Sequence, residues 1–109
     1  MQEPKTLWKL ARMHAARSSS PWVSASRDSD VTAASFKAWL HSLPVRSTAP
    51  CFIITGPHDA MATTWHDALH WLLSYFPQSG EVFVLDSDLR TVLTLTYVGI
   101  ARFSATAAA

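Results

Sequence analysis

Residues 51–57, Cys-Phe-Ile-Ile-Thr-Gly-Pro, are the stretch that decides the fold expected for this chain. The first five of them form a short apolar run, which Pro50 and Gly56 bound. Such a run is typical of a strand that is covered on both faces, and therefore of a central strand in a sheet. Gly56 and Pro57 then favour a turn, because both residues interrupt regular structure.

An amphipathic segment follows this strand, and we expect residues 60–76 to form a helix. At 100° per residue, the large apolar side chains of the segment fall on one helix face. They are Met61, Trp65, Leu69, Leu72 and Phe76. His66, Asp67 and His70 fall on the opposite face. Trp71 lies away from the apolar centre, so we expect it to be exposed and to contact a partner, since tryptophan is enriched in binding hot spots.

Two β-rich runs complete this half of the chain, at residues 81–85 and 91–103. A strand–helix–strand connection is normally a right-handed parallel crossover. The tight turn expected at residues 86–88 joins antiparallel strands instead. Together these rules predict a three-stranded mixed sheet over residues 51–103, in the order β-α-β-β.

Two further helices are expected upstream of the sheet. Residues 4–17 have apolar side chains at helical spacing, and Pro4 suits the first turn of a helix. Asp30 or Thr32 can cap a second helix, which Pro44 ends. The predicted fold class is therefore α+β, with the sheet covered by two N-terminal helices and one crossover helix.

The length of 109 residues fits a single small domain. We divide it into a basic amphipathic helix (1–17), a connection (18–32), the β-α-β-β core (51–103) and a frayed tail (104–109). No apolar stretch approaches the ~20 residues of a spanning helix, so we expect no membrane span and a cytoplasmic protein. The single cysteine, Cys51, excludes an internal disulfide and any site built on paired cysteines.

Charge is distributed unevenly along the chain. Residues 1–46 hold seven Lys and Arg against three Asp and Glu, whereas residues 47–109 hold two against five. Lys5, Lys9 and Arg12 share one face of the first helix, which could contact phosphate, a membrane surface or a partner protein, or could simply be solvated. Arg12 and Arg17, with the three serines at residues 18–20, also fit an organelle transit peptide. A net charge of +1 does not favour nucleic-acid binding.

The segment of residues 91–98 is long and uncharged. A three-stranded sheet leaves edges, and an edge strand of this kind invites pairing with another chain. We therefore expect a protein partner, or a homodimer formed through this strand. Thr94, Thr96 and Val98 are, with Trp71, the candidate partner-binding residues.

One motif suggests chemistry. His66 and His70 are four residues apart on one helix face, with Asp67 between them, which is the spacing of the zinc-protease helix with Asp in place of Glu. A catalytic zinc needs a third protein ligand, for which His58 or Glu81 are the candidates. A small metal-dependent hydrolase centred on this helix is therefore the alternative function.

Other catalytic signatures are missing from the sequence. There is no Gly-x-Ser-x-Gly elbow, and a single glycine before Pro57 falls short of a phosphate-binding loop. We expect no cofactor. The sequence favours a small non-catalytic protein-binding module acting through an apolar sheet edge or exposed aromatic side chains. Inhibitors, immunity factors and regulatory adaptors of bacteria and mobile elements are similar in size and composition.

Overall fold

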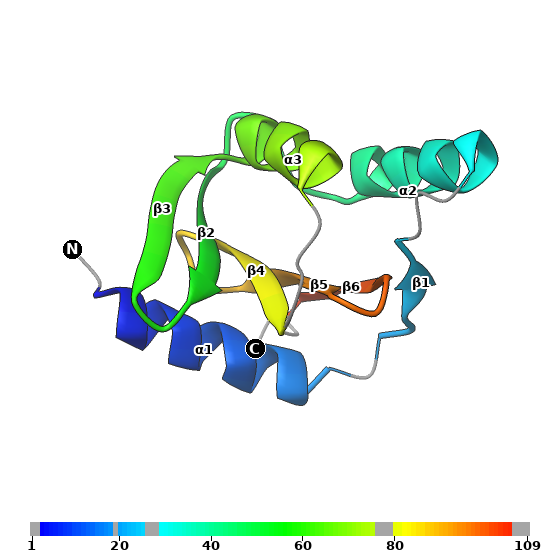
Figure 1. The fold of residues 1–109 in the computed structure, drawn as a ribbon. Helices are drawn as coiled ribbons and strands as arrows, with labels where there is room; N and C mark the ends of the chain where they lie inside the picture. Colours follow the sequence, from blue (N-terminus) through cyan, green and yellow to red (C-terminus); the bar gives the residue numbers. More distant parts are fainter. Residues whose placement is uncertain (1–2, 19, 26–28, 76–79, 106–109) are drawn as a thin grey trace.

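The computed structural model describes residues 3–18, 20–25, 29–75 and 80–105. They form a six-stranded sheet between two helical layers (Figure 1). In chain order the elements are α1 (Pro4–Ala16), β1 (Val23–Ser24), α2 (Asp30–Ser42), β2 (Pro50–Gly56), β3 (Asp59–Thr64), α3 (Trp65–Ser74), β4 (Glu81–Asp86), β5 (Thr91–Thr96) and β6 (Ile100–Ala105).

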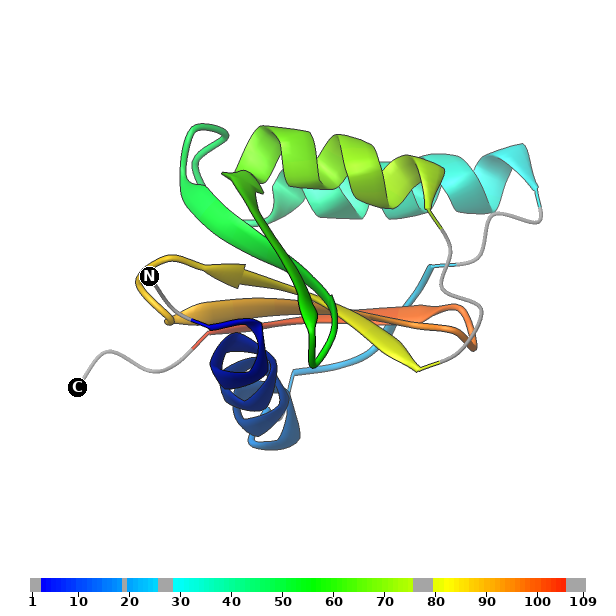
Figure 2. The ribbon, with the colours of Figure 1, turned by 60° about the vertical axis from the view of Figure 1, so that its left-hand side comes forward.

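The sheet has the strand order β1-β6-β5-β4-β2-β3, and every neighbouring pair is antiparallel. Helix α1 lies against one face of the sheet, and α2 and α3 lie on the other, as the turned view makes clear (Figure 2). The run that begins at Cys51 does form an interior strand, β2, between β4 and β3. The α+β class is thereby confirmed, whereas the predicted three-stranded mixed sheet is wrong.

The main error concerns the segment from Asp59 to Thr64, which forms strand β3 and not the first turns of a helix. The turn after Gly56 closes a hairpin, in which Ile53 pairs with Met61. The helix begins only at Trp65, because the Thr64 side chain caps it by accepting a hydrogen bond from the Asp67 N–H at 3.4 Å.

The presence of β3 changes the direction of β4 relative to β2. Because β3 reverses the chain, α3 returns it so that β4 runs antiparallel to β2. The two strands that α3 connects, β3 and β4, are each antiparallel to β2 and therefore parallel to each other, but β2 lies between them. The predicted parallel crossover from β2 to β4 is therefore wrong.

The second wrong prediction concerns the last predicted strand, which is two strands in the structure. Residues 91–103 are not continuous, because a turn at Tyr97, Val98 and Gly99 separates β5 from β6. Gly99 has a φ of 85°, a conformation that glycine adopts without steric cost. Part of the predicted tail, Ser104 and Ala105, belongs to β6, and residues 106–109 lie outside the described residues. The predicted connection 18–32 contains β1 and the start of α2.

The helices start where local chemistry satisfies their free N–H groups. Pro4 occupies the first turn of α1, as predicted. The cap of α2 is Ser29, whose side chain accepts a hydrogen bond from the Thr32 N–H at 3.2 Å, while the Thr32 side chain accepts one from the Ser29 N–H at 3.2 Å. The predicted caps, Asp30 and Thr32, thus lie inside the helix, with Thr32 completing the capping box.

The core has two parts, one on each face of the sheet, because successive side chains of a strand point to opposite faces. On the α2–α3 side, Phe36, Leu40, Trp65, Leu72, Val82, Val84, Leu93 and Leu95 are among the buried residues. On the α1 side, the buried set is Leu7, Ala11, Ala15, Ile54, Phe83, Leu85 and Val92. The second set is smaller and is concentrated on β2, β4 and the start of β5, which leaves the rest of this face for polar residues.

Candidate functional site

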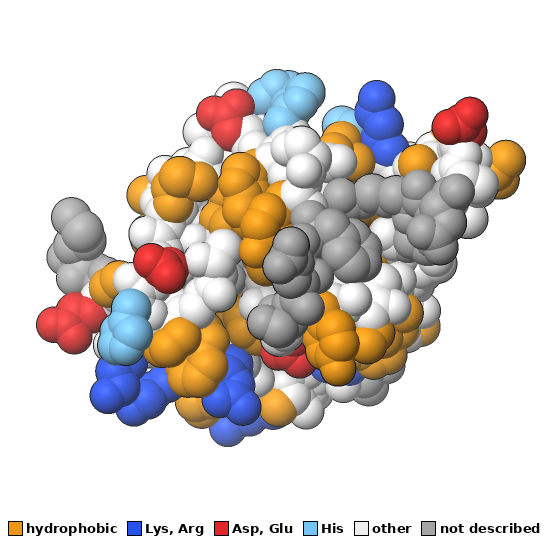
Figure 3. Space-filling view, viewed as in Figure 1, with side chains coloured by type: hydrophobic (Ala, Val, Ile, Leu, Met, Phe, Trp, Pro, Cys, Tyr) orange, Lys and Arg blue, Asp and Glu red, His pale blue; other side chains and the backbone are white. Residues whose placement is uncertain are grey.

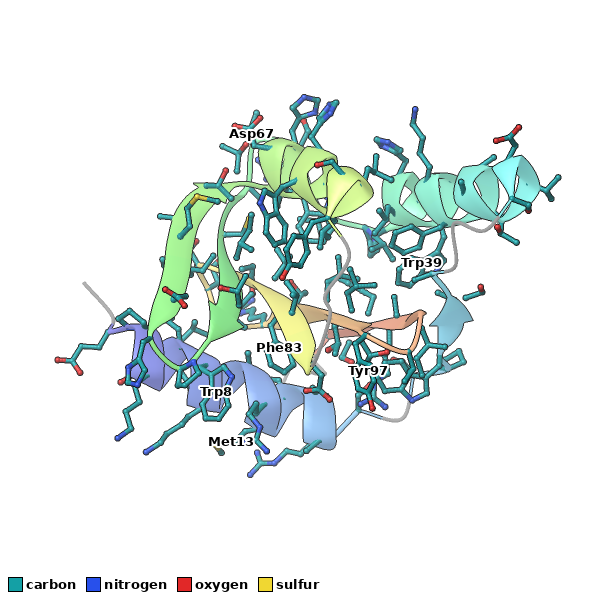
Figure 4. The ribbon with its side chains drawn as sticks, in the orientation of Figure 1. Trp8, Met13, Trp39, Asp67, Phe83 and Tyr97 are labelled. Carbon is teal, nitrogen blue, oxygen red and sulfur yellow. The ribbon has the colours of Figure 1, made fainter. Side chains whose placement is uncertain are left out.

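A groove with a volume of about 610 Å³ lies beside α1. It lies where the β2–β3 turn, the start of β4 and the β5–β6 turn meet the helix. Its lining consists of Trp8, Arg12, Thr55, Gly56, Pro57, Gly80, Glu81, Phe83, Thr96, Tyr97 and Val98. Figure 4 shows Trp8 on α1 and Phe83 on β4, with Tyr97 beyond the end of β5.

The groove forms because one helix is too narrow to cover its face of the sheet. Helix α1 places Leu7 and Ala11 over the side chains of Ile54 and Phe83. The small side chains of α1 at Ala11 and Ala15 keep it close to the sheet, but the start of β4 and the end of β5 extend beyond it (Figure 2). The face is therefore open beside Glu81 and Thr96, which are paired across β4 and β5.

The rim of the groove includes two exposed hydrophobic side chains. Tyr97 is 54% and Val98 is 62% exposed, and both belong to the turn after β5. Trp22, also exposed, lines a second cavity next to the groove. Three of the six large hydrophobic side chains that are exposed among the described residues thus surround one region. Large apolar side chains that gather at one surface mark an interaction site more often than scattered ones.

The groove also carries charge of both signs. The Arg12 guanidinium lies 4.6 Å from the centre of the Trp8 ring, which holds the cation over the aromatic face. Arg12 and Glu81 both line the groove and the adjoining cavity of about 180 Å³. The basic N-terminal half and the acidic C-terminal half of the sequence thus meet at this point.

The predicted partner-binding residues differ in how far they are exposed in the structure. Thr94 and Thr96 are 1% and 7% exposed, because β5 lies between β4 and β6. The expectation that residues 91–98 form a sheet edge is wrong, because Thr91–Thr96 pair with strands on both sides. Val98 is the exception, since it lies in the turn and is exposed at the groove. The actual edges are β3 and the two-residue β1.

Trp71 is half-buried, although we expected it to be exposed. Its ring stacks on Tyr75 with 4.3 Å between the ring centres and packs against the core under α3. The β2–β3 hairpin covers it further, because Trp71 shares a small hollow with Ile53 and Met61. The helical wheel did not predict that the hairpin covers Trp71, because it placed the hairpin residues on the helix.

The histidine pair lies on the outer surface of α3, where Figure 3 shows histidine side chains at the top of the molecule. The rings of His66 and His70 are 4.6 Å apart. Among the described residues, no group of three or more His, Cys, Asp and Glu side chains could hold a metal ion. His58 lies in the β2–β3 turn and Glu81 on the α1 side of the sheet, so neither candidate third ligand joins the pair.

The basic face of α1 is where the sequence placed it. Lys5, Lys9 and Arg12 are exposed, and Lys and Arg side chains gather along α1 at the bottom of Figure 3. Only Arg12 takes part in the groove. Sequence reasoning did not find Trp8, Phe83 or Tyr97, because these residues converge from three separate elements. The one available signal was Trp8 beside Arg12 at helical spacing.

Cys51 lies on strand β2 of the sheet, and its side chain is buried, with 2% of its surface exposed. Desolvation raises the pKa of its thiol from 9.0 to about 12, and the charges of Asp86 and Asp67 act in the same direction. The folded state therefore holds the thiol proton more strongly than the unfolded state. Its contribution to stability is complete below pH 9 and is lost as the pH rises towards 12.

Two results are expected from this burial. Cys51 in the folded chain should react with iodoacetamide at pH 8 far more slowly than in denaturant.

The unfolding midpoint should also fall less steeply between pH 9 and pH 11 in Cys51→Ala than in the natural chain. Chemical denaturation at a series of pH values measures the second effect, and equal slopes for the two proteins would contradict it.

No helix in the described ranges is long and apolar enough to cross a membrane. No protein-family model, no curated protein and no solved structure matches this chain, so its function has to be argued from the geometry of the groove.

Proposed function

We propose that this chain is a small non-catalytic binding protein that holds an extended apolar segment of a partner protein in the groove beside α1. The observation that carries the proposal is the convergence of Trp8, Arg12 and Tyr97 on one groove of about 610 Å³. Tryptophan, arginine and tyrosine are the residue types most enriched at binding hot spots.

The physical properties of the groove suit a peptide. Phe83 forms an apolar floor that is 1% exposed, while Tyr97 and Val98 form an exposed rim. Binding would bury this apolar rim, at a gain of roughly 25 cal/mol for each Å² removed from water. Arg12 and Glu81 add polar groups at one end, which can fix the direction of a bound chain.

A selection from a library of random displayed peptides tests the proposal directly. Peptides with large apolar residues should be enriched on the natural protein. Val98→Asp should weaken their binding by at least about tenfold, since it places a charge on the apolar rim beside Glu81. Binding can be measured by fluorescence anisotropy with labelled copies of the enriched peptides.

The chain offers a matched control for this experiment. Val31 on α2 is 75% exposed and lies on the opposite side of the sheet from α1, so Val31→Asp makes the same chemical change away from the groove. Peptide binding to this variant should equal that of the natural protein. Equal losses in the two variants, or a selection that enriches no peptide above background, would reject the groove as the binding site.

A further inference from the structure

Two residues that line the cavity next to the groove each carry a buried polar atom without a hydrogen-bond partner among the described residues. One is Oγ1 of Thr94, a residue that is 1% exposed and lines the cavity. The other is Nε of Arg102, which lines the same cavity from β6. The two residues are register partners on neighbouring strands, so their side chains lie next to each other on the α1 face. Buried groups of this kind normally have partners, and their lack of one needs a physical explanation.

The rest of the Arg102 side chain is held firmly. One terminal nitrogen donates a hydrogen bond to the carbonyl oxygen of Ala15 at 2.5 Å, and the other donates to that of Ser18 at 3.5 Å. The guanidinium lies 4.1 Å from the centre of the Trp22 ring. All of these partners are neutral, so they orient the positive charge without neutralising it. Of the guanidinium nitrogens, Nε is the buried one whose N–H has no hydrogen-bond partner among the described residues.

The charges around the cavity favour a ligand with one negative charge. Arg12 and Arg102 contribute two positive charges, and Glu81 contributes one negative charge. A carboxylate would balance this set, and it accepts hydrogen bonds readily from a guanidinium N–H and from a hydroxyl group. The volume of about 180 Å³ admits such a group without a large side chain. Trp22 and the small residues Ala15 and Ala16 form the remaining walls.

We infer that the cavity between Thr94, Arg102 and Trp22 binds a carboxylate group of the peptide that occupies the groove. This inference rests on the proposed function, because the cavity and the groove share Arg12 and Glu81. The carboxylate is either the C-terminus of the peptide or the side chain of an Asp or Glu residue. The pair of hydrogen bonds from Nε–H and the Thr94 hydroxyl would then set the position of the peptide along the groove.

The carboxylate site can be tested with acetate alone. In nuclear magnetic resonance spectra of the arginine Nε–H groups, the Arg102 signal is identified by its loss in Arg102→Lys. Adding sodium acetate to the natural protein should shift this signal until it saturates, whereas sodium chloride at equal ionic strength should not. Thr94→Val removes one of the two hydrogen bonds and should weaken acetate binding about tenfold.

Ser104→Ala is the matched control for Thr94→Val. Ser104 also carries a buried hydroxyl oxygen without a partner on the α1 face of the sheet, but it does not line the cavity. Acetate should bind this variant as it binds the natural protein, while both variants should melt at or above the temperature of the natural protein, because each loses an unpaired buried polar atom. Identical responses of the Arg102 signal to acetate and chloride, or unchanged acetate binding in Thr94→Val, would overturn the inference.

The peptides selected on the groove separate the two sources of the carboxylate and the two proposals. Replacing the C-terminus by an amide should weaken binding if the terminal carboxylate is bound, and replacing Asp or Glu by Asn or Gln should weaken it if a side chain is bound. Peptides that bind the groove equally well to natural protein and to Thr94→Val would reject the carboxylate site alone. Acetate binding without any selected peptide would reject the groove function alone.

Discussion

Phe83→Ala is expected to lower the free energy of unfolding by about 3–5 kcal/mol, which is the usual cost of deleting a large buried aromatic side chain. Phe83 is 1% exposed and lies at the centre of the α1 side of the core, where it pairs with Ile54 on β2 and with Thr94 on β5. Leu7 and Ala11 of α1 belong to the same buried cluster as Phe83. Because a small domain has about 5–15 kcal/mol in total, this single change removes a large share of the stability.

Guanidinium denaturation followed by circular dichroism measures this loss. Phe52→Ala is the control, because Phe52 lies one strand away on the same sheet face but is only half-buried. Its loss should be clearly smaller than that of Phe83→Ala. If the two variants lose equal stability, then α1 does not pack on Phe83 in the way described.

Arg102→Leu is expected to lower the free energy of unfolding by about 2–4 kcal/mol, because the hydrogen bonds that the charged guanidinium donates and its cation–π contact are lost. The guanidinium binds the carbonyl oxygens of Ala15 and Ser18 at the end of α1, and it stacks on Trp22. Carbonyl groups at a helix C-terminus have no partners within the helix, and a positive charge there is favourable. One side chain on β6 therefore ties the end of α1 and the following segment to the sheet.

The control for this prediction is Arg17→Leu, which removes the same charge from an exposed position at the C-cap of α1. It should change the unfolding free energy by no more than about 0.5 kcal/mol, as is usual for surface substitutions. Hydrogen exchange of the amides in the last turn of α1 gives a second measurement, since these amides should exchange faster in Arg102→Leu alone. Unchanged exchange rates would show that Arg102 does not hold the helix end.

Several elements could be predicted because their signals are local. Helix α1 begins at Pro4 and α2 ends before Pro44, as proline chemistry requires. The strand over residues 51–55 is interior, as its continuous apolar run indicates. His66, Asp67 and His70 are exposed on α3, as the wheel placed them. Each of these features depends on residues close together in the sequence.

The main error arose where a local pattern predicted the wrong element. Residues 60–64 continue the helical wheel of α3, yet they pair with β2 as a hairpin. The choice between helix and strand depends on partners that are distant in the sequence, since β propensity mainly reflects packing against neighbours. The signal that was available is the Thr64 cap three residues before Asp67, which marks the true start of the helix.

The sequence by itself determined the α+β class, three helices, the buried β2 strand and the exposed basic face of α1, because proline positions, caps and apolar spacing act over a few residues. Only the tertiary structure decided that β5 is interior and that Trp8, Phe83 and Tyr97 line one groove. It also decided that Thr94 and Arg102 share a cavity. These contacts join residues far apart in the chain, and they depend on the order of the strands, which hydrogen bonding and burial set for the sheet as a whole.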